Sequence, residues 1–201
     1  MKFFQKKADL PQDVQERVPP GQYLTEKWPI LHYGPIPTFN PKTWDFRVFG
    51  RVEHELRMDW EELQKLDQTT VQADMHCVTT WSRLEQRWEG IPFSKIVELA
   101  KPPPDAKFVI AHSEYGFTAN TPIEYCLRDD CLIALRANGE PLAPEHGKPA
   151  RLVVPRLYAW KSAKWLRGIE FSVMDKPGFW ERNGYHNVGD PWKEQRYWGD
   201  E

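Results

Sequence analysis

The amino-acid sequence predicts an α+β fold of mixed short sheets, short helices and long loops, in a single domain spanning residues 1–201. Short runs with the two-residue alternation of half-buried strands recur along the chain, and segments with helix-start signals lie between them. Strands and helices do not alternate regularly, which argues against a parallel sheet covered by helices. The length of 201 residues is enough to bury a sizeable core.

The two ends of the chain differ in character from its middle. Residues 1–27 are polar without a sustained period, which predicts an arm or a short helix lying on the body. Residues 28–41 hold four prolines and three aromatic residues, a composition typical of an irregular segment packed on a surface. After Asp175 the chain is again aromatic and polar, so we expect a wrapped tail and a core at about residues 28–175.

Six segments have the pattern of strands. They are 44–52, the run from Thr70 that ends at Cys77, 107–111, 131–136, 150–155 and 168–174. Asn138-Gly139 is a common hairpin dipeptide and predicts a turn after the fourth of them.

Helices are predicted at three places. Residues 59–66 have acidic residues in the first turn, and residues 91–100 have a proline near the start and three consecutive prolines just beyond the end. Thr121-Pro122-Ile123-Glu124 has the pattern of a capping box, so a helix should begin there. The polar segment 82–87 predicts a turn.

Charge and hydropathy argue against several classes of protein. The net charge is −2 with both signs interspersed, so we expect no nucleic-acid or anionic-membrane partner. No apolar run approaches the roughly 20 residues that a membrane span needs. The first residues, Met1 to Lys7, lead directly into polar sequence without a secretory apolar region or a twin-arginine signal, so we expect a cytoplasmic protein.

The three cysteines have no Cys-x-x-Cys spacing, which argues against a disulfide framework and a tetrahedral zinc site. Cys126 and Cys131 lie near apolar residues and are expected to pack as small hydrophobic side chains. Cys77 differs from these two cysteines in having polar neighbours, although most cysteines in intracellular proteins are buried and inert. Its polar neighbours, among them Thr79 and Thr80, would need hydrogen-bond partners in a core, and they favour a thiol that holds a metal or reacts.

A basic cluster follows the strand at 150–155. Arg151, Lys161, Ser162 and Lys164 fall within fourteen positions and could converge on a phosphate group, for which charge-assisted hydrogen bonds are well suited. An ordinary solvated basic loop over residues 156–167 is the alternative.

Three groups of residues resemble one known family. They are Met75–Trp81 with Trp88–Pro92, Gly147–Pro155 with Tyr158–Trp165, and, more weakly, Ile30–Gly34. They resemble the metal-ligand segment and the pterin-binding strand and loop of the sulfite oxidase family of molybdopterin oxidoreductases, which includes the compact bacterial catalytic subunits that reduce methionine sulfoxide. The resemblance covers roughly residues 28–175 and implies the sulfite oxidase-type fold. It also implies one pterin and one molybdenum, with Cys77 as the thiolate ligand.

The resemblance carries over to individual positions. The residues implied to contact the cofactor are Leu31, His32, Ser113, His146, Arg151, Ser162, Ala163 and Lys164, to which the basic cluster adds Lys161. Ala163 would contribute main chain only. His146 departs from an asparagine common at that position in the family, although an imidazole can still donate one hydrogen bond.

The implied reaction is a two-electron oxygen-atom transfer on a small oxo-substrate of the sulfite, sulfoxide or N-oxide type. Cys77, Arg156 and Tyr158 are the candidates for catalysis, with His32, Tyr33 and Trp160 also at the pocket mouth. The sequence contains neither a haem-attachment motif nor iron–sulfur spacing, so an external electron-transfer protein is expected as partner. The dimerisation domain of the larger relatives is absent after the core, and we expect a monomer.

Two other functions remain open from the sequence. A cofactor-free thiol redox enzyme could use Cys77 with His76 or His112 as base. A non-catalytic binding module could use the many aromatic residues, ten Trp among them.

Overall fold

The computed structural model describes residues 4–201, and within this range the strands form two sheets. The 5-stranded sheet has the order β4-β3-β12-β7-β8. Its strands are β3 (Asp45–Gly50), β4 (Leu56–Asp59), β7 (Phe108–Ser113), β8 (Thr118–Pro122) and β12 (Leu166–Ser172). Strand β12 pairs parallel with β3 and antiparallel with β7, so a late segment of the chain forms the centre of this sheet.

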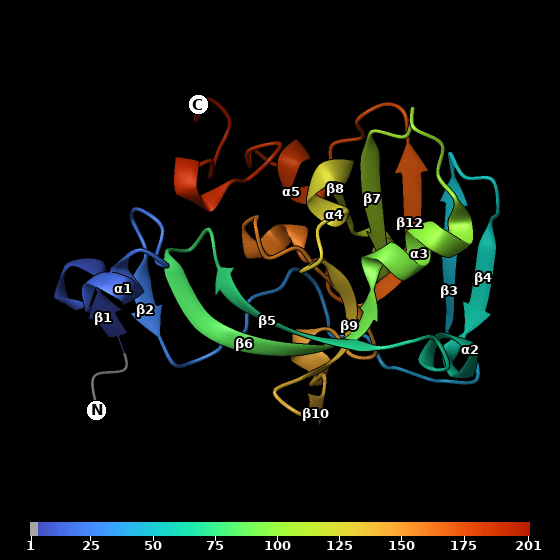
Figure 1. Ribbon diagram of the computed structural model, residues 1–201, viewed down its shortest axis with the longest axis horizontal. Helices are drawn as coiled ribbons and strands as arrows, with labels where there is room; N and C mark the ends of the chain where they lie inside the picture. Colours follow the sequence, from blue (N-terminus) through green and yellow to red (C-terminus); the bar gives the residue numbers. More distant parts are fainter. Residues whose placement is uncertain (1–3) are drawn as a thin grey trace.

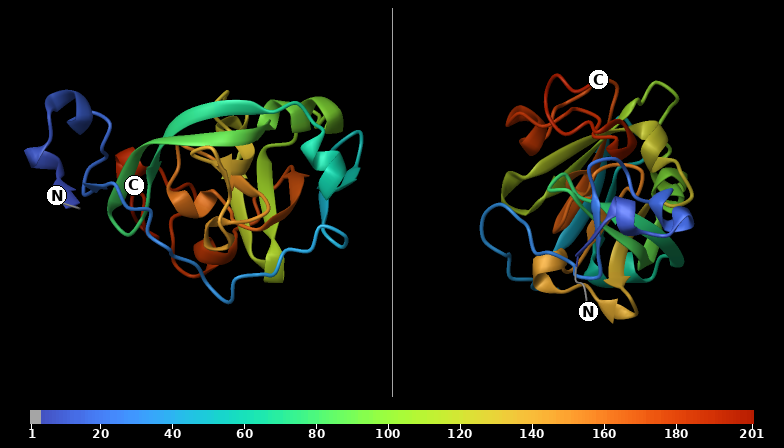
Figure 2. Two further views of the ribbon diagram at one scale, coloured as in Figure 1. Left: turned by 90° about the horizontal axis from the view of Figure 1, so that it is seen from below. Right: turned by 90° about the vertical axis from the view of Figure 1, so that its left-hand side faces the viewer.

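The 7-stranded sheet is built around β6. Its path is β1-β2-β6-β9-β10, while β5 pairs with β6 and β11 pairs with β9. Its strands are β1 (Phe4–Lys6), β2 (Tyr23–Thr25), β5 (Thr69–His76), β6 (Trp81–Pro92), β9 (Leu132–Ala137), β10 (Glu140–Pro141) and β11 (Arg151–Val153). The β5–β6 hairpin extends from the region of the 5-stranded sheet toward the N-terminal arm (Figures 1 and 2).

The helices are short. The α-helices are α1 (Gln12–Gln15), α2 (Trp60–Gln64), α3 (Phe93–Ala100), α4 (Ile123–Cys126) and α5 (Phe179–Arg182). The 3₁₀ helices are η1 (Lys7–Asp9), η2 (Glu114–Gly116), η3 (Pro144–His146), η4 (Ala159–Lys161) and η5 (Pro191–Lys193). Helix α3 crosses one face of the 5-stranded sheet and buries Phe93 and Ile96 (Figure 1). Among residues 4–201, no helix has the length and apolar character needed to cross a membrane.

Two clusters of buried hydrophobic side chains hold the sheets together. The larger one includes Phe46 of β3, Ile133 of β9 and Leu166 of β12, all fully buried. The second includes Trp88 of β6 and, at its edge, Cys77. Mixed sheets with a few short helices confirm the predicted α+β class.

Most of the predicted elements are present. Helix α2 begins with a capping box in which the Asp59 side chain accepts from the Glu62 amide at 2.8 Å and the Glu62 side chain accepts from the Asp59 amide at 2.9 Å. The hairpin at Asn138-Gly139 joins β9 to β10. The predicted arm contains β1, η1, α1 and β2, except for its residues 1–3, which lie outside the described residues.

Two local predictions were wrong. Residues 82–87 are not a turn but part of β6, where Arg83, Gln86 and Arg87 pair with β5. One face of an antiparallel sheet can be turned to solvent, so such a segment can be polar and still be a strand. Thr121 does not cap a helix, because β8 stays paired with β7 through Pro122 and Thr121 is buried within it. Helix α4 therefore begins after Pro122 without a side-chain cap.

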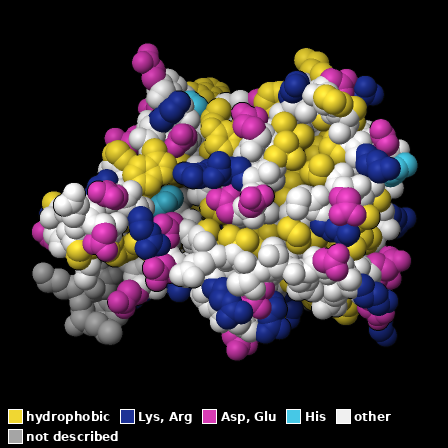
Figure 3. Space-filling model, in the orientation of Figure 1, with side chains coloured by type: hydrophobic (Ala, Val, Ile, Leu, Met, Phe, Trp, Pro, Cys, Tyr) yellow, Lys and Arg dark blue, Asp and Glu magenta, His cyan; other side chains and the backbone are white. Residues whose placement is uncertain are grey.

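The other two cysteines and the visible surface agree with the sequence. Cys126 and Cys131 are free and at most 1% exposed, as expected of small hydrophobic side chains. On the face drawn in Figure 3, side chains of both charge signs are interspersed with hydrophobic ones.

Candidate functional site

A cavity of about 400 Å³ lies where the end of β5, the irregular segment 28–36, the loop after β11 and the C-terminal tail meet. Seven of the predicted site residues line it. They are Leu31, His32, Cys77, Arg151, Ser162, Ala163 and Lys164. The fold thus brings together side chains from four distant parts of the sequence.

Cys77 is the one cysteine among the lining residues and directly follows β5. It begins a tight turn, in which its amide donates to the Trp81 carbonyl at 2.9 Å and its carbonyl accepts from the Thr80 amide at 3.0 Å. The Thr79 hydroxyl oxygen lies 3.2 Å from the sulfur. Burial raises the pKa of the Cys77 thiol, while the Thr79 hydrogen bonds and the charges of nearby cations act in the opposite direction.

Both ends of the chain hold this turn in place. The amide group of Gln22, in the N-terminal arm, donates to the Cys77 carbonyl at 3.1 Å. The guanidinium of Arg196, in the C-terminal tail, donates to the Val78 carbonyl at 2.7 Å. The sulfur is therefore carried by a backbone segment that is bonded on two sides.

Arg151 is a buried cation whose described neighbours leave it without a carboxylate partner. It is 1% exposed and donates to the main-chain oxygens of His146 at 3.0 Å and Ser162 at 2.9 Å. Its guanidinium lies over the rings of Trp28 and Trp88, and its Nε atom has no partner among residues 4–201. Burial lowers the pKa of Arg151 to about 9. A charge in this setting is costly unless an anion accompanies it.

Lys164 is a second cation on the same cavity wall. Its ammonium donates to the carbonyls of Leu31 and Glu145, both at 2.8 Å, and so ties the segment 28–36 to η3. Burial and, next, the charge of Arg151 lower the pKa of Lys164 to about 7. Gly147 allows the approach, since a side chain there would meet Arg151 and Lys164 at 3.1–3.2 Å.

Ser162 and Ala163 shape the wall between these cations. The Ser162 hydroxyl accepts from the Val154 amide at 2.9 Å and keeps its own proton free to donate. The Ala163 carbonyl accepts from the Leu152 amide, which anchors the loop to β11. His32 is exposed at the rim, where its ring meets Trp165 edge-on at 5.6 Å.

Aromatic side chains form much of the remaining wall. Trp160 and Tyr33, both expected at the mouth, line the cavity, and Tyr185 and Trp180 lie beside them. Several lining residues were not predicted from the sequence. They are Trp28, the loop at Glu114–Phe117, and Phe179, Trp180 and Tyr185 of the tail. The aromatic richness of the tail was a signal, but nothing local showed that it folds back over Cys77.

Four other predicted residues do not line the cavity. Arg156 is exposed on the surface of the loop. Tyr158 is fully buried with its ring stacked on Trp160 at 5.3 Å, so it supports a wall residue instead of facing the cavity. Ser113 is buried next to the cavity residue Glu114. The His146 ring is stacked on Trp28 at 3.7 Å.

Lys161 is the largest departure from the prediction. Its ammonium is fully buried and forms an ion pair with Glu181, so it does not line the cavity. It also donates to the carbonyl of Asn120 and to that of Asn187. The physical reason is that these partners, distant in the sequence, hold the Lys161 ammonium in the interior, while Ser162 and Lys164 line the cavity.

The site residues present fit an anionic, metal-bearing ligand. Arg151 and Lys164, which have no carboxylate partner among residues 4–201, line one cavity with a single thiol, and the orphaned Nε of Arg151 provides an unused donor. Among residues 4–201, no three His, Cys, Asp or Glu side chains gather as a metal-binding group. A metal in this cavity would thus take Cys77 from the protein and its other ligands from a cofactor.

The comparisons with known proteins agree with this geometry. Residues 33–180 match the family described as oxidoreductase molybdopterin binding domain. A Bacillus subtilis protein described as uncharacterized oxidoreductase YuiH is 47% identical over 94% of this chain and 96% of its own length. The catalytic subunit MsrP of the Campylobacter jejuni protein-methionine-sulfoxide reductase is 28% identical over 71% of this chain, which spans 54% of that relative.

A solved structure and a larger enzyme extend the comparison. The crystal structure of the sulfane dehydrogenase SoxCD from Paracoccus pantotrophus superimposes with a TM-score of 0.66 at 22% identity, over 87% of this chain and 55% of that one. This likeness confirms the sulfite oxidase-type fold. A nitrate reductase of Beauveria bassiana is 27% identical over 84% of this chain, which covers only 23% of that enzyme.

Proposed function

We propose that this chain, which belongs to the sulfite oxidase-like family of molybdopterin oxidoreductases, catalyses a two-electron oxygen-atom transfer on a small oxo-substrate. The observation that carries the proposal is that Cys77 lines one cavity together with Arg151 and Lys164, two cations that have no carboxylate partner in the part of the chain that the structure describes. When bound, a molybdenum–pterin cofactor supplies the redox centre that can exchange an oxygen atom with a substrate.

Different residues of the chain would bind different parts of such a cofactor. The Cys77 sulfur would bind the metal as thiolate, and the Thr79 hydroxyl is placed to donate to that sulfur. Arg151 and Lys164 would bind the anionic end of the pterin, since both line the cavity and donate to main-chain carbonyls of its wall. The Ser162 hydroxyl has a proton left to donate there.

The aromatic wall supports a neutral substrate in preference to a dianion. Both lining cations are assigned to the cofactor, and the surfaces of Trp160, Trp180 and Tyr185 offer apolar contact and exclude water. A sulfoxide or N-oxide fits such a wall better than sulfite, because an unpaired dianion loses its hydration there without a cation to replace it.

The thiol-enzyme alternative finds less support. The His76 ring nitrogen Nδ1 lies 2.8 Å from the Ser82 hydroxyl and is buried in the strand pair. The His112 ring nitrogen Nε2 pairs with Glu170 at 3.0 Å. Each candidate base is therefore engaged with a partner other than Cys77.

The test is metal and pterin analysis of protein purified from a molybdenum-replete host. We expect stoichiometric molybdenum, pterin fluorescence after release, and reoxidation of the reduced protein by members of a sulfoxide and N-oxide panel. Cys77→Ser should lose turnover and the thiolate-to-metal absorption band. Protein that contains neither molybdenum nor pterin would refute the proposal.

We also propose an external electron-transfer protein as partner and a cytoplasmic location. Both are expectations from the sequence alone. Cell fractionation and reduction of the loaded protein by candidate electron carriers would test them.

A further inference from the structure

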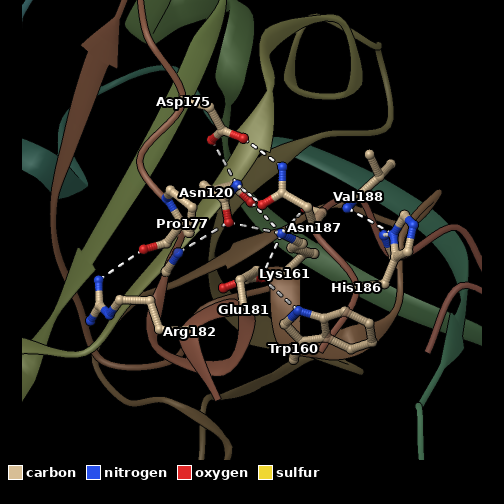
Figure 4. A network of polar contacts seen from close by, with 12 residues as sticks. Asn120, Trp160, Lys161, Asp175, Pro177, Glu181, Arg182, His186, Asn187 and Val188 are labelled. Atoms are coloured by element: carbon tan, nitrogen blue, oxygen red, sulfur yellow. Dashed lines mark hydrogen bonds and ion pairs between the residues drawn. The ribbon is translucent and has the colours of Figure 1, made fainter. Parts of the chain in front are cut away.

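The buried ion pair between Lys161 of η4 and Glu181 of α5 lies next to Trp160, an aromatic residue that lines the cavity (Figure 4). Both side chains are at most 1% exposed. The Lys161 ammonium is further bonded to the Asn120 carbonyl and the Asn187 carbonyl, both at 2.7 Å. The pair therefore joins the basic loop, β8 and the C-terminal tail at one point.

Glu181 also accepts a hydrogen bond from the indole of Trp160, which lines the cavity. The Trp160 Nε1–H donates to the same oxygen of Glu181 that accepts from Lys161, at 2.8 Å. On its other side the Trp160 ring is packed against the backbone of Gly189, where any side chain would come within 2.7 Å of the ring. The indole is thus fixed in position and in rotation.

The same carboxylate is linked to the rest of the wall through the chain. Trp180 precedes Glu181 on α5 and stacks on Tyr185 with ring centroids 4.9 Å apart. Tyr185 in turn meets Trp160 edge-on at 5.1 Å. Trp160, Tyr185 and Trp180 form a continuous aromatic wall. Glu181 is hydrogen-bonded to Trp160 at one end of this wall and follows Trp180, the other end, in the chain.

Stability alone gives a weak reason for this pair. Desolvating two charges costs about as much as their attraction returns, and apolar replacements of such pairs are often neutral or stabilising. A carboxylate oxygen is required, however, to satisfy the buried indole N–H of Trp160.

We propose that Glu181, with its charge balanced by Lys161, is a positioning residue that sets the aromatic wall and thereby the fit of the substrate. Glu181 does not touch the cavity, so it acts through Trp160 and Trp180. The kinetic part of this inference rests on the proposed oxygen-atom transfer, whereas the structural part does not.

Two double variants separate positioning from ion pairing. Lys161→Met/Glu181→Gln removes both charges but keeps an oxygen for the Trp160 indole. Lys161→Met/Glu181→Met removes both charges and also that oxygen. A role in ion pairing alone predicts that the two variants behave alike, because both lack the ion pair and both fill the same interior space with side chains of similar size.

The structural readout is the indole region of the NMR spectrum of the full chain labelled with ¹⁵N-tryptophan. The Trp160 signal, assigned by its loss in Trp160→Phe, should stay in place in the Gln variant and shift in the Met variant. The matched control is Trp165, whose Nε1–H donates to the Pro144 carbonyl at 2.7 Å and should not move in either variant. This measurement needs no turnover and no cofactor.

The kinetic readout is the split between KM and kcat for a turned-over sulfoxide. We expect KM to rise by about tenfold in the Met variant, because the loss of one buried hydrogen bond corresponds to a change of about that size. The values of kcat and the molybdenum content should change much less. The Gln variant should retain a KM near that of the parent protein. Should either double variant fail to fold, Trp160→Phe leaves the ion pair intact and should raise KM to the same extent.

The outcomes are distinct. Equal KM values in the two double variants, or a Trp160 signal that does not shift in the Met variant, would overturn the positioning role. Absence of molybdenum would instead refute the proposed reaction and leave the NMR result to decide on Glu181.

Discussion

The sulfur of Cys77 lies 3.2 Å from the hydroxyl oxygen of Thr79, two residues further along the same turn. This is the one side-chain hydroxyl recorded in contact with the thiol within the described residues. A hydrogen bond to a metal-bound thiolate withdraws electron density from it, and such bonds tune the metal through its ligand.

Replacing Thr79 should therefore change the electronic properties of the site without displacing the metal. We expect Thr79→Val, which keeps the shape and removes the hydroxyl, to move the thiolate-to-metal absorption band to lower energy and the midpoint potential to more negative values. Thr79→Ser is the control and should resemble the parent protein. A spectrum and potential unchanged in Thr79→Val would show that the hydroxyl does not donate to the sulfur.

Removal of the Arg151 charge should weaken cofactor retention. Arg151→Met leaves an apolar side chain of similar length, and we expect pterin affinity to fall by about one to two orders of magnitude, as for a lost charge-assisted contact to phosphate. Arg151→Lys should recover only part of it, because a lysine lacks the fork of donors. The measurement is pterin and molybdenum content after dialysis.

Arg156→Gln is the matched control for Arg151. It removes an arginine from the same region, but one whose side chain is exposed and outside the cavity lining. Its cofactor content should equal that of the parent protein. A loss as large as that of Arg151→Met would mean that both arginines act through the general charge of the loop.

Anion binding to cofactor-free protein should weaken as the pH rises through about 7. Burial, followed by the charge of Arg151, lowers the pKa of Lys164 to about 7, so the side chain is charged below this pH and neutral above it. An anion favours the charged form, and its affinity should fall by up to about tenfold per pH unit above the pKa. Sulfate, which does not titrate in this range, is the probe, and sulfate-dependent thermal stabilisation is the measurement.

Lys164→Met should abolish this pH dependence while leaving the remaining sulfate affinity, which Arg151 supplies, nearly constant. An equally steep dependence in Lys164→Met would assign the titration to another group.

Loss of the Arg196 contact should loosen the turn that carries Cys77. The Arg196 side chain is 13% exposed and donates to the Val78 carbonyl, so Arg196→Met should lower the free energy of unfolding by about 1–3 kcal/mol. Because this bond holds the metal-bearing turn, molybdenum should also dissociate faster. Urea denaturation and metal release into a chelator measure the two effects.

Arg51→Met is a suitable comparison for Arg196→Met. Arg51 forms an exposed pair with Asp105, neither residue lines the cavity, and such pairs contribute little to stability. Metal release from Arg51→Met should match the parent protein. Equal release from the two variants would argue that Arg196 does not hold the turn.

Local sequence was sufficient for features that depend on neighbouring residues. The helix at 59–66, predicted from the acidic residues of its first turn, the hairpin at Asn138-Gly139 and the alternating strands follow from short-range interactions and side-chain alternation. The separate character of Cys77 was also visible, because polar residues surround it in the sequence itself.

Pairing with the preceding strand decided the features that were predicted wrongly. Residues 82–87 are a strand because β5 supplies their partners, and Thr121 stays extended because β7 does. The composition of each segment taken alone does not show the strand that it pairs with, so the polar composition and the capping pattern were misleading.

The sequence by itself determined the chemistry of this protein: a thiol in a polar turn, a basic loop after a strand, and the fold family to which they belong. The tertiary structure alone decided which side chain serves which purpose. Lys161 and Lys164 are three positions apart on one loop, yet Glu181 of the tail draws the first into a buried ion pair while the second faces the cavity. The reason is physical, since the direction of a loop side chain is set by partners that lie far away in the sequence, and burial permits a charge only where such partners exist.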